Sequence, residues 1–127
     1  MSSKNYSNTK ILIVDDDSTF LTLAGAALSK RGFSVISAES GETALDKINA
    51  DAPDLVLLDI HMPGLTGDEL VKSITDWKPE IPVWMVSSDL TPAIKEECLK
   101  NGASACLVKP LDFDQLALNI RELLNKP

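Results

Sequence analysis

Five short apolar runs alternate with longer segments of helical spacing along the chain. The runs cover residues 10–14, 33–37, 54–58, 81–86 and 104–108. Several of them are apolar without alternation, which is typical of strands buried on both faces. Between the first two runs, apolar side chains recur at steps of three and four, and Arg31-Gly32 provides a basic last turn and a glycine stop. The pattern predicts five strands, each followed by an amphipathic helix.

Residues at the ends of the predicted helices support this division. The later helices begin with capping residues, which are Thr66 with Glu69, Thr91 before Pro92, and Asp112 with Gln115. Asn101-Gly102 ends the fourth helix as Gly32 ends the first. A right-handed crossover lays each helix against the sheet that its strands form. We therefore expect an α/β fold with a five-stranded parallel sheet and helices on both faces.

Length and composition indicate one folded domain. A chain of 127 residues is long enough for a single core and too short for two. We assign residues 1–9 to a polar leader, 10–124 to the domain and 125–127 to a tail. Apolar residues make up 44% and charged residues 24%, which is ordinary for a globular protein and unlike a disordered one.

Charge and cysteine content narrow the classes of partner. The formal net charge of -7, from 12 basic and 19 acidic residues, argues against binding of nucleic acid or an anionic membrane. Protein or small-ligand partners are expected instead. Cys98 and Cys106 lack metal or redox spacing, and no apolar segment approaches a membrane span or a signal peptide. We expect a cytoplasmic protein.

Polar residues follow the predicted strands at their carboxyl ends, where open parallel sheets bind ligands. They are Asp15, Asp16 and Asp17 after the first strand, Asp59 after the third, Ser87 and Ser88 after the fourth, and Lys109-Pro110 after the fifth. If the first and third strands are neighbours, their carboxylates converge and repel one another unless a cation is present. Mg²⁺ suits such oxygen ligands and leaves positions open for phosphate oxygens. A cation, a lysine and a hydroxyl together indicate phosphoryl chemistry.

Each of these residues also has an ordinary structural interpretation. Asp17 fits the N-terminus of the first helix. Asp59 fits a turn after a strand, the two serines fit a polar loop, and Lys109 fits a solvated strand end. The joint occurrence of all of them at strand carboxyl ends favours a common site over coincidence.

Four ordered motifs resemble the receiver domains of two-component response regulators, the CheY-like family. They are ILIVDDD, LVLLDIHMPGLTGDEL, PVWMVSS and GASACLVKP, and the resemblance covers residues 10 to about 124. It implies a flavodoxin-like (βα)5 sandwich with strand order 2-1-3-4-5. It also implies that Asp59 accepts a phosphoryl group from a phosphohistidine on a sensor histidine kinase or a histidine phosphotransfer protein.

The resemblance implies a role for each strand-end residue. Mg²⁺, or Mn²⁺ as a substitute, would be held directly by Asp16 and Asp59, through a water by Asp15, and by the backbone carbonyl of His61. The phosphoryl oxygens would be bound by the Ser87 hydroxyl, the Ser88 N–H and Lys109, and the Lys109–Pro110 bond is expected to be cis. The resemblance also implies that His61 and Asp89 tune dephosphorylation. The alternatives are that His61 is an exposed loop residue and that Asp89 caps or flanks the fourth helix.

The fifth strand departs from the family pattern. In the family, one position of this strand usually carries Tyr, Phe or His, whose side chain turns inward on phosphorylation. Cys106 occupies this position here, and its small thiol cannot take the place of an aromatic side chain. We expect Cys106 to pack as a small buried apolar residue. Signalling would then use the loop after Ser87 and the fourth helix.

Taken together, these features predict a phosphorylation-dependent switch that modifies only itself and is not a turnover enzyme. A downstream target protein or output domain would read it, and the chain would be a monomer or weak dimer. A haloacid-dehalogenase-type phosphatase would need a second aspartate where His61 stands. A nucleotide or flavin binder is disfavoured, because the three aspartates would repel phosphate. A degenerate receiver that acts only as a docking surface stays open as a further alternative.

Overall fold

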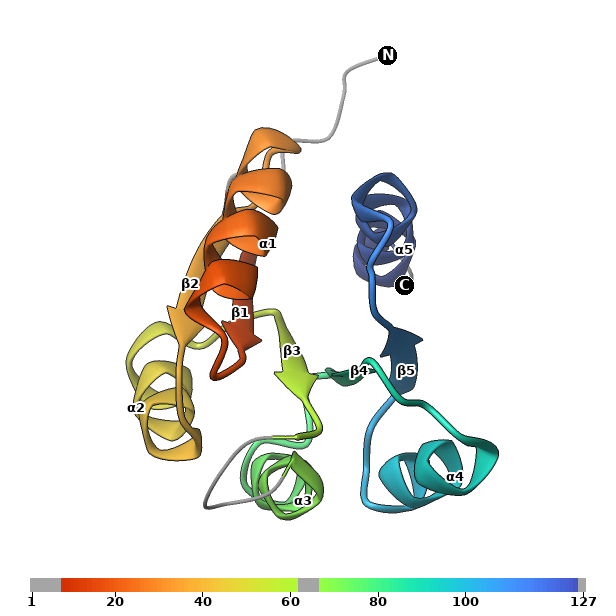
Figure 1. Cartoon of the computed structure of the whole chain (residues 1–127). Coiled ribbons are helices and arrows are strands. Elements are labelled where there is room, and N and C mark those ends of the chain that lie inside the picture. Colours follow the sequence, from red (N-terminus) through yellow and green to blue (C-terminus); the bar gives the residue numbers. More distant parts are fainter. Residues whose placement is uncertain (1–7, 62–66, 126–127) are drawn as a thin grey trace.

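The computed structural model describes residues 8–61 and 67–125, in which strands and helices alternate (Figure 1). The strands are β1 (Lys10–Val14), β2 (Ser34–Ala38), β3 (Leu55–Asp59), β4 (Val83–Ser87) and β5 (Ala105–Val108). The helices are α1 (Ser18–Lys30), α2 (Gly41–Asp51), α3 (Gly67–Trp77), α4 (Pro92–Lys100) and α5 (Phe113–Asn125). All strand pairs are parallel, in the order β2-β1-β3-β4-β5. This confirms the predicted flavodoxin-like α/β fold.

Some sequence predictions fall on residues that are not described. The capping residue Thr66 lies outside the described residues, as do residues 1–7 of the predicted leader and 126–127 of the predicted tail. The strand bounds within the described residues differ slightly from the apolar runs. β2 and β3 each begin and end one residue later than predicted, and β4 begins at Val83 instead of at Ile81.

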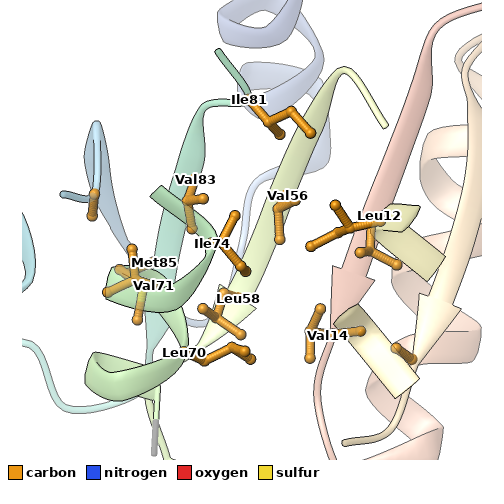
Figure 2. Packing of buried hydrophobic residues seen from close by; sticks show 14 of the residues in the cluster. Leu12, Val14, Val56, Leu58, Leu70, Val71, Ile74, Ile81, Val83 and Met85 are labelled. Atoms are coloured by element: carbon orange, nitrogen blue, oxygen red, sulfur yellow. The ribbon is translucent and has the colours of Figure 1, made fainter. Parts of the chain in front are cut away.

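The sheet separates two apolar cores. α1 and α5 cover one face, and α2, α3 and α4 cover the other (Figure 1). Along β1, Leu12 and Val14 face the second group of helices, while Ile11 and Ile13 face the first. Figure 2 shows Leu12 and Val14 packed in a cluster with side chains of β3, α3 and β4. Burial on both faces explains why the strand runs are apolar without alternation.

Side-chain caps define where the helices begin. Asp17 Oδ1 accepts hydrogen bonds from the backbone N–H groups of Thr19 and Phe20, at 3.0 and 3.3 Å. Thr91 caps α4 in the same way through Ile94 N at 3.2 Å. Asp17 therefore caps the N-terminus of α1, as its structural interpretation predicts, and the three aspartates do not share one role.

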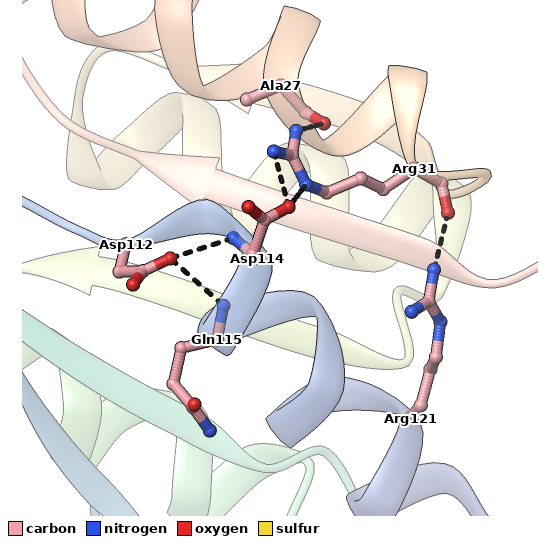
Figure 3. Close-up of polar contacts among 6 residues, drawn as sticks. All are labelled: Ala27, Arg31, Asp112, Asp114, Gln115 and Arg121. Atoms are coloured by element: carbon pink, nitrogen blue, oxygen red, sulfur yellow. Dashed lines mark hydrogen bonds and ion pairs between the residues drawn. The ribbon is translucent and has the colours of Figure 1, made fainter.

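Polar contacts join the last turn of α1 to α5 (Figure 3). The Arg31 guanidinium donates to Asp114 Oδ1 at 2.8 and 3.0 Å and to the Ala27 carbonyl at 2.8 Å. Arg121 donates to the Arg31 carbonyl at 3.1 Å. The Asp114 side chain is 84% exposed, so its ion pair contributes at most about 1 kcal/mol. The apolar core between α1, α5 and the sheet is therefore the main contact that positions α5.

Two glycines at helix ends make a matched pair for a stability test. Gly32 (φ +98°) and Gly102 (φ +116°) both have left-handed backbone, but only at Gly102 would a methyl group meet a neighbour, 2.6 Å from Thr75 Oγ1. Gly32→Ala is expected to lower the free energy of unfolding by about 1 kcal/mol and Gly102→Ala by about 2 kcal/mol. Urea unfolding of both variants measures the difference. Equal losses would contradict the steric argument.

Candidate functional site

The register of the sheet brings the predicted residues to one edge. Val14 pairs with Leu58, so Asp15 and Asp59 follow at the same level of neighbouring strands. Ser87 pairs with Val108, and the Lys109 N–H donates to the Ser87 carbonyl at 2.8 Å. The carboxyl ends of β1, β3, β4 and β5 therefore meet, as the parallel topology requires.

Asp59 is a buried carboxylate among other charges. It is 7% exposed at the end of β3, and its Oδ1 accepts a hydrogen bond from the His61 N–H at 3.2 Å. Burial and the neighbouring charge of Asp15 raise the pKa of Asp59 to about 6. The His61 N–H and the charge of Lys109 oppose this rise in pKa, and Asp16 adds to it. The site therefore holds more negative charge than its lysine compensates.

Asp15 and Lys109 form an ion pair at the carboxyl edge of the sheet. Lys109 Nζ lies 2.7 Å from Asp15 Oδ2, with the two side chains 21% and 2% exposed. Asp15 Oδ1 accepts a hydrogen bond from the Asp17 N–H at 2.9 Å. Both carboxylate oxygens of Asp15 thus have protein partners, and Lys109 is held at the carboxyl edge of the sheet.

The carboxylates have the arrangement of a cation site. Asp15, Asp16 and Asp59 each offer an oxygen atom within 4.8 Å of the others, with Asp15 and Asp59 buried and Asp16 exposed. Hard carboxylate oxygens beside open solvent suit Mg²⁺, which binds a few carboxylates and keeps several waters. The raised pKa of Asp59, to which both other aspartates contribute, shows the repulsion that a bound cation would relieve. The residues present therefore fit Mg²⁺.

Ser87 ends β4, and Ser88 and Asp89 lie in the loop that leads to α4. Ser87 is completely buried, and its Oγ accepts a hydrogen bond from the Asp89 N–H at 3.0 Å. Ser88 and Asp89 are exposed. The Ser87 hydroxyl is therefore at the sheet edge and also fixes the first turn of the following loop.

Two more sequence predictions concern the loop residues of the site. The Lys109–Pro110 peptide bond is cis, as expected. His61 is exposed, and its N–H contacts Asp59. The roles of its carbonyl as a metal ligand and of its ring in dephosphorylation stay predictions.

Cys106 differs from the expectation of a buried residue. It is only partly buried, because β5 is an edge strand. Its Sγ lies 4.0 Å from the Lys95 carbonyl oxygen of α4, and its thiol is hydrogen-bonded to the fully buried Cys98. Burial raises the pKa of the Cys106 thiol above its ordinary value. Cys106 thus contacts α4 from the strand next to the site.

Sequence reasoning missed one residue of the site, Phe20. Lys109 Nζ lies over its ring, 4.1 Å from the centroid. Phe20 is one of the apolar side chains that recur at steps of three and four in the first helix, and this spacing predicts only an amphipathic helix. No local motif shows that the start of α1 faces the loop after β5.

Comparisons with known proteins agree with the geometry. Residues 11–121 match the family described as response regulator receiver domain. A CheY-like receiver domain protein from Methanospirillum hungatei superimposes with a TM-score of 0.86 at 31% identity, covering 92% of this chain and 94% of that one. The receiver domain of NtrX from Brucella abortus superimposes with a TM-score of 0.85 at 34% identity, covering 92% and 99%.

Longer regulators contain a similar segment. The chain is 41% identical over 114 residues to the transcriptional regulatory protein ZraR of Klebsiella oxytoca, covering 90% of this chain and 26% of ZraR. It is 33% identical over 119 residues to the alkaline phosphatase synthesis transcriptional regulatory protein PhoP of Bacillus subtilis, covering 94% and 50%. The chain spans between a quarter and a half of the length of these two relatives. None of the helices within residues 8–61 and 67–125 is both long and apolar enough to cross a bilayer. With the family match and the two receiver-domain structures, the chain belongs to the response regulator receiver domains of two-component signal transduction.

Proposed function

We propose that the chain is a phosphorylation-dependent switch that accepts a phosphoryl group on Asp59. The observation that carries this proposal is the meeting of Asp59 with two other carboxylates and a lysine at the carboxyl edge of the sheet. The donor would be a phosphohistidine of a sensor histidine kinase or a histidine phosphotransfer protein. The reader would be a target protein or an output domain, and the compartment would be the cytoplasm.

The transfer is a substitution at phosphorus. A carboxylate oxygen of Asp59 attacks the phosphorus, the P–N bond of the phosphohistidine breaks, and the leaving imidazole nitrogen keeps the electron pair. Lys109 exchanges its contact with Asp15 for a phosphoryl oxygen. The Ser87 hydroxyl and the Ser88 N–H donate to the other oxygens. The chain thereby catalyses its own modification, and water later hydrolyses the acyl phosphate.

The carboxylates are proposed to hold Mg²⁺, or Mn²⁺ in its place. Asp16 and Asp59 would bind it directly, Asp15 through a water, and His61 through its backbone carbonyl. When bound, the metal neutralises charge on the phosphoryl oxygens. The engagement of both Asp15 oxygens by the Asp17 N–H and Lys109 supports an indirect role for Asp15.

The output is proposed to pass through the β4–α4 loop. The Ser87 Oγ accepts the Asp89 N–H in the unmodified chain. A turn of this hydroxyl toward a phosphoryl oxygen would release the N–H and move the start of α4. Cys106, which contacts α4 at the Lys95 carbonyl, replaces the usual aromatic side chain. The loop, rather than an aromatic side chain of β5, would therefore transmit the change.

Incubation with phosphoramidate, with and without Mg²⁺, tests the proposal by intact mass. The wild-type chain is expected to gain one phosphoryl group in the presence of Mg²⁺, and Asp59→Asn is expected to gain none. Asp54→Asn is the matched control, because Asp54 is an exposed aspartate that directly precedes β3, whereas Asp59 ends it. It should be labelled like wild type. No gain in wild type, or undiminished gain in Asp59→Asn, would overturn the proposal.

A further inference from the structure

Lys109 is held from two sides by one segment of the chain. Its ammonium lies 2.7 Å from Asp15 Oδ2 and 4.1 Å from the centroid of the Phe20 ring. Asp15 follows β1, and Phe20 lies in the first turn of α1. A cation over an aromatic face at this distance is attracted by the ring quadrupole. Phe20 is therefore a second electrostatic partner of Lys109.

The Phe20 ring is itself fixed in position. Its backbone N–H donates to the capping residue Asp17, whose own N–H donates to Asp15. The side chain is half-buried and packs against the apolar core that α1 and α5 form with the sheet. The turn that orients the Asp15 carboxylate therefore also orients the ring.

The two partners act differently on the lysine. Asp15 holds the ammonium through a charge that neutralises it, whereas the ring attracts the ammonium and leaves its charge uncompensated. The ring and Lys109 also line an apolar groove with Phe113. Such surroundings reduce the screening of the ammonium by water.

We propose that Phe20 is a positioning residue for phosphoryl transfer, which holds the Lys109 ammonium at the site while its carboxylate partner is exchanged. This inference rests on the function proposed above. During the exchange from Asp15 to a phosphoryl oxygen, the ring keeps the lysine stem in place without competing for its charge. Phe20 acts through Lys109 and does not touch the reacting atoms.

A double-mutant cycle measures this coupling. Phe20→Leu, which keeps an apolar side chain without a ring, is expected to lower the rate constant for labelling by phosphoramidate about 2- to 30-fold. Phe20→Tyr, which keeps the ring, should restore it. In a Lys109→Ala background, Phe20→Leu should change the rate less than about 2-fold. An equal loss in both backgrounds would show a merely structural role and overturn the inference.

A second measurement does not depend on phosphorylation. The side-chain protons of Lys109 next to the ammonium are expected to show an upfield ring-current shift in the NMR spectrum of wild type and Phe20→Tyr. The shift should be lost in Phe20→Leu and kept in Phe113→Leu, the matched control from the same groove. A shift unchanged by Phe20→Leu would overturn the inference alone. Absence of labelling in wild type would instead overturn the proposed function, and the positioning role with it.

Discussion

Lys109→Ala is expected to lower the rate constant for phosphorylation of Asp59 by about 100- to 1,000-fold. Phosphoryl transfer brings further negative charge to a site that already contains Asp15 and Asp59, both buried. Lys109 is the cation of the described site, and loss of one such preorganised donor in a partly desolvated site has an effect of this size. Labelling with phosphoramidate at saturating Mg²⁺, followed by intact mass, gives the rate constant.

Controls separate this effect from loss of folding. Lys109→Ala leaves the Asp15 carboxylate buried without its ammonium partner, so the variant is also expected to be less stable. Far-UV circular dichroism must therefore show a folded variant under the labelling conditions. Lys10→Ala removes an exposed lysine at the other end of β1 and should be labelled like wild type. A folded Lys109→Ala variant that is labelled at the wild-type rate would refute the role of the lysine.

The positions of the site residues could be predicted because parallel strands end at a common edge. Asp15, Asp59 and Lys109 each directly follow or end an apolar run, and the topology then brings them together. The exact strand ends could not be predicted in the same way. The third and fourth apolar runs end directly before a polar residue, whereas the backbone pairing of β3 and β4 includes Asp59 and Ser87. Both polar side chains are buried at the carboxyl edge of the sheet, where the site lies.

The contacts between individual side chains could not be predicted from the sequence. Lys109 was expected near a phosphoryl group, but its partners in the structure are Asp15 and the ring of Phe20. Which of several nearby charges a lysine contacts depends on the loop path and on burial, and neither is encoded in a local motif. Cys106 illustrates the same limit, because its partial exposure follows from the place of β5 at the edge of the sheet.

The buried charge of Asp59 has a measurable effect on stability. In the unfolded chain its carboxyl titrates near the ordinary value of 3.8, whereas folding raises the pKa of Asp59 to about 6. Between these two values the folded state binds a proton that the unfolded state has lost, so the stability of wild type falls as the pH rises through this window. Above it, the ionised carboxylate lowers the free energy of unfolding by up to about 3 kcal/mol.

Asp59→Asn is therefore expected to be more stable than wild type at pH 7.5 in a metal-free buffer, although it removes the phosphoryl acceptor. The gain should shrink at pH 5, where the wild-type carboxyl is largely protonated. Urea unfolding followed by tryptophan fluorescence, to which the buried Trp84 contributes, measures both differences. Asp54→Asn, which changes the exposed aspartate that directly precedes the same strand, should show no such gain. Added Mg²⁺ should stabilise wild type more than Asp59→Asn, because the cation binds the folded carboxylates. A gain that is equal at both pH values would show that the charge of Asp59 is not its source.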